Sequence, residues 1–136
     1  MFKKIQIGYL RLRIFNDLMT IKMSEAIRNL SPKPLWNKFA DLNAVPRPSK
    51  KETRVIQFMK DFGTSLGFET VEDEVGNVII KKPASQGMED RKAIVMQSHL
   101  DMVHQKNGDT VFDFDTQGIE MYVDGDWVRA LSLIYF

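Results

Sequence analysis

Residues 93–101 read AIVMQSHLD and combine the pattern of a strand with two residues suited to a functional site. Its first four residues form a short, continuous apolar run, which is typical of a strand buried on both faces of a sheet. The run leads directly into His99 and Asp101, whose side chains can bind metal ions and transfer protons. In open α/β sheets, sites form at the carboxyl ends of strands, where the loops diverge. We therefore expect a buried strand over residues 93–96 with a site at its end.

The spacing of His99 and Asp101 places their side chains on the same side if the extended geometry continues past the strand. A histidine that binds a metal needs its ring orientation and tautomer fixed, and a nearby carboxylate supplies both. A histidine that is only hydrogen-bonded at a strand end would show the same pattern, so the pair alone leaves both interpretations open. His104, which precedes the polar residues 105–109, is expected to be a solvated loop residue.

Two helices are expected before this strand. The first begins near Ser31-Pro32 and carries an apolar face formed by Leu35, Phe39 and Leu42.

The second helix follows the proline-containing segment 45–49. Ser49 lies three residues before Glu52, which is the spacing of a capping box. Gly67 is a natural left-handed residue at which this helix would end. The apolar stripe of the helix consists of Val55, Met59, Phe62 and Leu66.

Extended segments on both sides of His99 complete an α/β pattern. Residues 68–72 alternate between apolar and polar side chains, and residues 75–77 form a turn into a second run at 78–80. Residues 81–90 are expected to form a surface loop. Three further extended pieces are predicted at 110–114, 119–123 and 127–130, with a hairpin turn at Asp124-Gly125.

The composition limits the kinds of functional site that the chain can form. The 136 residues are 43% hydrophobic and 27% charged, which is typical of one globular domain. The absence of cysteine excludes disulfides, thiolate metal sites and thiol nucleophiles. Because the chain has two histidines, a transition-metal site must be built from them and carboxylates. Residues 23–136 carry a small net negative charge, so the sequence does not predict nucleic-acid binding.

Several short motifs resemble one family when they are taken in order. The sequence is similar to the amino-terminal part of the bacterial aminoacyl-histidine dipeptidases, also called cytosol non-specific dipeptidases, which are zinc peptidases. The resemblance covers about residues 23–130. The motifs that carry it are Ser31-Pro32-Lys33-Pro34-Leu35-Trp36, Val45-Pro46-Arg47-Pro48-Ser49, Asp73-Glu74-Val75-Gly76-Asn77-Val78, Lys82-Pro83-Ala84, Gln97-Ser98-His99-Leu100-Asp101-Met102-Val103, Gln105-Lys106-Asn107 and Asp124-Gly125-Asp126-Trp127-Val128.

The resemblance implies an α/β fold, namely the amino-terminal part of a zinc-exopeptidase-like catalytic domain with two helices followed by the strands of a mixed sheet. It also implies that His99 is a zinc ligand and that Asp101 assists catalysis and orients that ligand. The family uses two zinc ions per site and hydrolyses Xaa-His and other dipeptides in the cytoplasm. A metal-activated water is the nucleophile.

The sequence departs from the family after Ala130. Residues 131–136 read LSLIYF, where the resemblance implies a segment containing an aspartate that bridges the two metals. A glutamate pair, further aspartate and histidine ligands and the family's dimerisation domain are missing too. We therefore expect an incomplete, inactive catalytic domain that does not retain the zinc pair, with a tail at 131–136 that a frameshift or truncation would explain.

Residues 1–22 precede the family-like region and carry five basic side chains against one acidic. We expect a non-native extension with translation starting at Met23, or else a basic amphipathic helix at a membrane surface. The segment is too short and too charged to span a bilayer. Two functional alternatives to a dipeptidase fragment stay open: a non-catalytic α/β binding module, and a membrane-surface protein that depends on residues 1–22.

Overall fold

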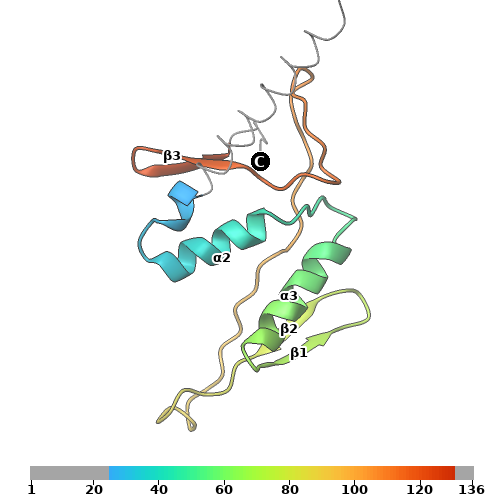
Figure 1. Cartoon of the computed structure of the whole chain (residues 1–136). Helices are drawn as coiled ribbons and strands as arrows, with labels where there is room; N and C mark the ends of the chain where they lie inside the picture. The colour runs from blue at the N-terminus through green and yellow to red at the C-terminus, as the bar shows by residue number, and fades with distance from the viewer. Residues whose placement is uncertain (1–24, 131–136) are drawn as a thin grey trace, which may run out of the picture.

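The structure is a computed structural model, and it describes residues 25–130 (Figure 1). Residues 25–28 are helical, and the following elements are α2 (Lys33–Asn43), α3 (Thr53–Ser65), β1 (Glu69–Glu72), β2 (Val78–Lys81), β3 (Met121–Asp124) and β4 (Trp127–Ala130). This order of helices and then strands confirms the expected α/β pattern. The extension at 1–22 and the tail at 131–136 lie outside the described residues, so the division of the chain stays a prediction.

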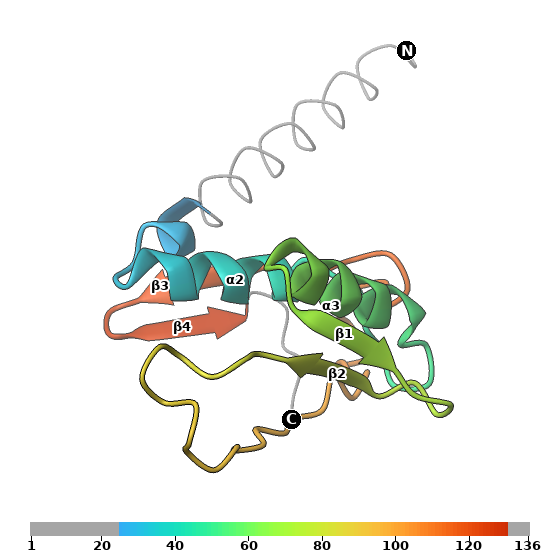
Figure 2. The same cartoon turned by 90° about the horizontal axis from the view of Figure 1, so that it is seen from below.

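Both strand pairs are antiparallel hairpins, β1 with β2 and β3 with β4. Figure 2 shows the first hairpin beside α3, and this helix packs on both of its strands. The closest approach is at Gly63, where an added Cβ atom would lie 2.2 Å from Thr70 Oγ1 and 3.0 Å from Ile80 Cγ1. Glycine is therefore needed at this position for α3 to lie against the sheet.

The local signals at the end of α3 and in the first hairpin are confirmed. Gly67 has a φ of 73°, in the left-handed region that favours glycine. The turn between β1 and β2 is organised by Asp73. Its Oδ1 accepts the backbone N–H groups of Val75 and Asn77 at 3.1 and 2.8 Å, and its Oδ2 accepts the Asn77 amide at 2.7 Å. Such Asx turns fold from local sequence alone.

The capping box expected at the start of α3 is wrong. The helix begins at Thr53, its N-cap is Glu52, and that cap makes no side-chain hydrogen bond. The Glu52 carboxylate instead accepts the backbone N–H of Lys50 at 2.5 Å. The Ser49 hydroxyl points to Asp101, at a distance of 2.6 Å. A carboxylate 52 residues away therefore competes successfully with the helix terminus for this serine.

The buried strand expected at residues 93–96 is also wrong. The segment is irregular, and Ile94, Val95 and Met96 are 83, 93 and 90% exposed. Figure 1 shows the chain after the loop that follows β2 running as an extended trace past α2 and α3. An apolar run becomes a buried strand only if other strands hydrogen-bond to it, and none of the four described strands pairs with this one.

The second hairpin forms as predicted, but its turn lies one residue later than expected. Asp124 ends β3 and pairs with Trp127, so the two strands are joined by Gly125 and Asp126. Gly125 adopts a φ of 58°, as two-residue hairpin loops require. Of the three extended pieces predicted after His99, the one at 110–114 is not a strand. Phe112 from this piece is nevertheless buried.

The described part of the chain has a small core. Its buried apolar side chains are Ile27, Ala40, Val55 and Phe112. The helix α2 forms as expected, with Leu35 and Phe39 on one face. These two side chains are 61 and 42% exposed, so much of this face is not covered by the described residues. No helix within residues 25–130 is long and apolar enough to cross a membrane.

Candidate functional site

The candidate site is built where two segments far apart in sequence meet as parallel chains. The N–H of Met102 donates to the Arg47 carbonyl at 2.9 Å, and the N–H of Ser49 donates to the Met102 carbonyl at 3.0 Å. Pro48 and Met102 are thereby paired in a parallel bridge. The proline-containing segment thus lies directly against the residues that follow His99.

The side chains of His99 and Asp101 meet, as their spacing predicts. His99 Nδ1 lies 3.0 Å from Asp101 Oδ1 and 2.9 Å from the Asp101 carbonyl oxygen. The His99 side chain is 76% exposed and that of Asp101 is 32% exposed. Because Nδ1 faces Asp101, Nε2 is the ring nitrogen with which His99 would bind a ligand from solvent.

Asp101 is held from its other side by Ser49. The Ser49 hydroxyl donates to Asp101 Oδ2 at 2.6 Å, a length typical of a bond to an ionised carboxylate. These contacts lower the pKa of Asp101, with the hydroxyl of Ser49 as the largest cause and the imidazole of His99 as the next. Asp101 is therefore a charged acceptor that can keep the Nδ1 proton of a neutral His99 in place.

Arg47 fixes the proline-containing segment to the end of α2. Its guanidinium donates to the Leu42 carbonyl at 2.5 Å and to Asn43 Oδ1 at 3.0 Å. Arg47 is 9% exposed and Asn43 is 4% exposed. Burial lowers the pKa of the guanidinium, because a charged group is desolvated there. The bridge to Met102 thus begins from a residue that is itself anchored in the interior.

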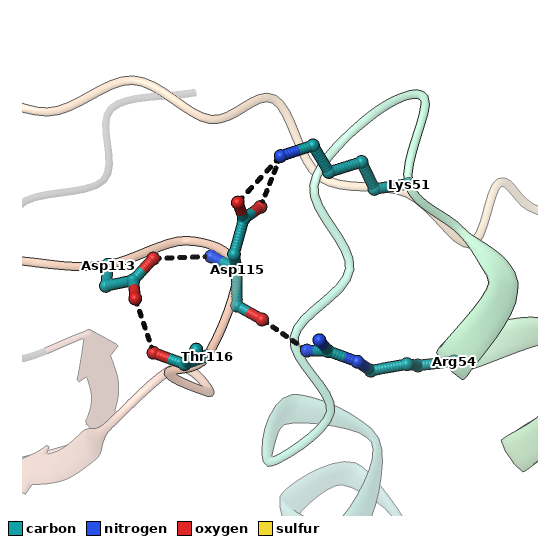
Figure 3. A network of polar contacts seen from close by, with 5 residues as sticks. All are labelled: Lys51, Arg54, Asp113, Asp115 and Thr116. Atoms are coloured by element: carbon teal, nitrogen blue, oxygen red, sulfur yellow. Dashed lines mark hydrogen bonds and ion pairs between the residues drawn. The ribbon is translucent and has the colours of Figure 1, made fainter.

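A second polar network ties the start of α3 to residues 113–117 (Figure 3). The Lys51 ammonium lies 2.7 Å from each carboxylate oxygen of Asp115, and the Arg54 guanidinium donates to the Asp115 carbonyl. The carboxylate of Asp113 accepts the Asp115 N–H at 2.9 Å and the Thr116 hydroxyl at 2.6 Å. These acidic side chains are engaged in a turn and an ion pair, which accounts for their position without a metal.

His104 is exposed, as expected, and its ring lies edge-on to Phe114 with centroids 5.9 Å apart. Within residues 25–130, no three histidine or carboxylate side chains come together to hold a metal ion. The His99–Asp101 pair fits one place in a zinc site, because a ligating histidine usually donates its other ring N–H to a carboxylate or carbonyl oxygen. The described residues thus offer one oriented ligand.

Ser49 belongs to the site, although its sequence pattern predicts only a helix cap. Its spacing to Glu52 indicated a helix cap, whereas its actual partner lies 52 residues away. A signal was present, because Ser49 and Asp101 both lie in motifs that carry the resemblance.

The comparisons with known proteins point to one class, the dipeptidases. No family model matches the sequence. The chain is 48% identical over 108 residues to a curated protein, and it matches a solved structure at 47% identity with a TM-score of 0.74. At this identity, the match confirms the resemblance that the motifs predicted.

The curated relative is the cytosol non-specific dipeptidase of Escherichia coli (strain K12), and the alignment covers 79% of this chain and 22% of that protein. The solved structure is the aminoacylhistidine dipeptidase of Vibrio alginolyticus, with 78% of this chain and 22% of that chain covered. The chain therefore spans about a fifth of the length of the relatives it matches. It resembles one region of a dipeptidase.

Proposed function

We propose that the described region supplies part of the metal site of a dipeptidase, with His99 as a zinc ligand through Nε2 and Asp101 as the carboxylate that orients it. One observation carries the proposal: Asp101 Oδ1 lies 3.0 Å from Nδ1 of His99. That contact is the one expected for a histidine ligand whose tautomer is fixed by a second residue. The similarity to two dipeptidases supports the same assignment.

For the complete dipeptidase site to which this region would contribute, we propose the hydrolysis of a dipeptide in the cytoplasm, in line with the names of the two relatives. A bound zinc pair would polarise the scissile carbonyl and lower the pKa of a water to about 7. His99 contributes a neutral nitrogen, and Asp101 holds the proton on the opposite ring nitrogen. We also assign Asp101 a role in catalysis, because the resemblance implies one.

We further propose that the 136-residue chain alone does not turn over dipeptides. A catalytic zinc in proteins usually takes three protein ligands, and residues 25–130 place one imidazole with its orienting carboxylate. The relatives are about five times longer than the matched region, so their remaining length has room for the other ligands.

Zinc titration of the ¹⁵N-labelled chain tests the proposed ligand. We expect the Nε2 resonance of His99 to move as zinc is added, and that of His104 to move only at higher zinc concentration. His104→Ala is the matched control and should leave the His99 response unchanged, whereas His99→Ala should abolish the response seen at the lower zinc concentration. An equal response of both histidines would overturn the assignment of His99.

A hydrolysis assay with an aminoacyl-histidine dipeptide tests the second part. We expect no turnover above background by the purified chain in the presence of zinc. Turnover that is lost in His99→Ala would show that the chain is catalytically complete and would contradict this part of the proposal. A stable monomer in which zinc does not perturb His99 would instead favour a non-catalytic binding module.

A further inference from the structure

We propose that Ser49 is a positioning residue of this site: its hydroxyl fixes the carboxylate of Asp101, which in turn fixes the ring and tautomer of His99. The inference extends the function proposed above and rests on it. Ser49 lies far from His99 in sequence, and two contacts join them in space: Ser49 Oγ with Asp101 Oδ2, and Asp101 Oδ1 with His99 Nδ1.

His99 depends on Asp101 for its orientation. With 76% of its side chain exposed, the imidazole is held by little packing, and the contacts at Nδ1 are those that define its ring position. A neutral imidazole carries one proton, and the hydrogen bond made by one nitrogen decides which nitrogen has it. An acceptor fixed opposite Nδ1 keeps the proton there and leaves the lone pair on Nε2.

Asp101 depends in turn on Ser49. One carboxylate oxygen, Oδ1, faces His99 and the other, Oδ2, accepts the Ser49 hydroxyl at 2.6 Å. The same hydroxyl lies 3.2 Å from the Met102 carbonyl, and because it has a single proton the shorter contact to the charged acceptor is the favoured bond. Holding Oδ2 restricts rotation of the carboxylate and aims Oδ1 at the ring.

Ser49 is itself placed by its backbone, independently of its hydroxyl. Its N–H donates to the Met102 carbonyl, and the preceding Pro48 is buried in the parallel bridge to Met102. The next residue, Lys50, has a φ of 70°, which is uncommon for a residue with a side chain. The N–H of Lys51 closes this turn onto the Pro48 carbonyl at 2.9 Å. Removing the hydroxyl should therefore leave the path of the chain unchanged.

The test measures the histidine tautomers of the full chain by long-range ¹H–¹⁵N correlation at about pH 8.5, where an ordinary imidazole is neutral. In the parent chain we expect His99 to carry its proton on Nδ1. Ser49→Ala should shift a measurable part of the His99 population to the Nε2–H tautomer, because the uncharged Asp101 carbonyl oxygen at 2.9 Å then remains as the acceptor with a fixed position. His104 serves as an internal control and should not change.

Matched variants separate the hydroxyl from side-chain size. Ser49→Thr and Ser49→Val both add bulk, but only threonine keeps the hydroxyl, so threonine should preserve the parent tautomer and valine should shift it. Ser65→Ala removes a hydroxyl that is bonded to the Phe62 carbonyl at the end of α3, and it should leave His99 unchanged. The amide resonance of Met102 reports whether the parallel bridge persists in each variant.

Zinc binding gives a second measurement. It tests the proposed function, whereas the tautomer tests the role of Ser49. Because partners of metal ligands typically change affinity by about 10–100-fold, we expect Ser49→Ala to weaken zinc binding at His99 by about tenfold or less. If zinc does not bind at His99 in the parent chain, the proposed function is wrong, yet the tautomer still decides the role of Ser49. A tautomer unchanged in Ser49→Ala and Ser49→Val, with the Met102 amide in place, would overturn the inference.

Discussion

Arg47 donates a hydrogen bond to Asn43 Oδ1 at 3.0 Å, and both residues are buried. This contact joins the last residue of α2 to the segment that reaches Asp101 through Ser49. Arg47→Met would keep much of the side-chain bulk but leave Asn43 Oδ1 without this donor, whereas the Leu42 carbonyl would still accept the Val45 N–H at 3.2 Å. Since an unsatisfied buried polar group costs about 1–3 kcal/mol, we expect a loss of that order in the free energy of unfolding.

Urea unfolding followed by tryptophan fluorescence measures this loss. Arg28→Met is the matched control, because Arg28 pairs with Asp41 at 2.8 Å through side chains that are 39 and 36% exposed. An ion pair this exposed contributes about 0–1 kcal/mol. Equal losses of unfolding free energy in the two variants would show that the buried Arg47 contact stabilises the fold no more than an exposed ion pair does.

Gly63→Ala is expected to destabilise the packing of α3 on the first hairpin. Alanine is the better helix former by about 1 kcal/mol, but its Cβ atom would lie 2.2 Å from Thr70 Oγ1 and 3.0 Å from Ile80 Cγ1. Forcing a carbon into a filled space typically costs about 1–3 kcal/mol, so we expect a net loss of stability. Thermal unfolding by circular dichroism measures it.

Two further variants test the cause of that loss. Gly108→Ala adds the same methyl group where no atom lies within 4 Å, and it should leave the melting temperature nearly unchanged. Combining Gly63→Ala with Thr70→Ala removes the nearest clashing atom, so the double variant should lose less than the two single losses added together. Strict additivity would argue against a direct clash.

The sequence predicts those parts of the molecule that depend on neighbouring residues. The end of α3 at Gly67 and the two hairpin turns follow from conformations that glycine favours and from the side chain of Asp73. The contact between His99 and Asp101 is of the same kind, because two residues of spacing suffice to bring them together.

The predictions that are wrong concern residues whose partners lie far away in sequence. Ser49 has Glu52 as a possible local partner, and only the parallel bridge at Met102 shows why Asp101 is chosen instead. The apolar pattern at residues 93–96 is that of a buried strand, but burial depends on neighbouring strands that the pattern itself does not specify. Local sequence therefore predicts the elements of this fold better than the contacts between them.

Acidification is expected to loosen the turn between β1 and β2. The pKa of Asp73 is lowered chiefly by the Asn77 side-chain amide and then by the Asn77 backbone N–H. Because the folded pKa lies below that of the unfolded chain, the carboxylate stabilises the turn fully above about pH 4, the ordinary range for aspartate. This contribution is lost as the pH falls through the folded pKa. A ¹³C titration of the Asp73 carboxyl group measures the shift.

Asn77→Ala removes the largest cause and keeps the backbone donor, so the pKa of Asp73 should rise part of the way toward its ordinary value. Hydrogen exchange at the β1–β2 amides should become faster in this variant at neutral pH. Asp73→Asn should make the exchange of these amides insensitive to pH over the range in which Asp73 titrates, after correction for the intrinsic rate. A parent-like pKa in Asn77→Ala would contradict this account of the turn.

The segment at residues 94–96 is expected to drive self-association. Three consecutive apolar side chains are at least 83% exposed there, on a backbone that pairs with none of the four described strands. Unpaired extended segments of this kind offer backbone donors and acceptors to a second chain. Val95→Lys places a charge in the segment, and it should raise the concentration at which oligomers appear in sedimentation velocity experiments.

Val111→Lys is the matched control, because Val111 is 98% exposed but precedes the buried Phe112 instead of lying in an apolar run. If general surface hydrophobicity drove association, both substitutions would reduce it equally, since each replaces one exposed valine with the same charge. If backbone pairing along residues 94–96 drives it, Val95→Lys should act much more strongly. Hydrogen exchange at the amides of 94–96 should also slow as the parent chain associates, because pairing would remove these N–H groups from water.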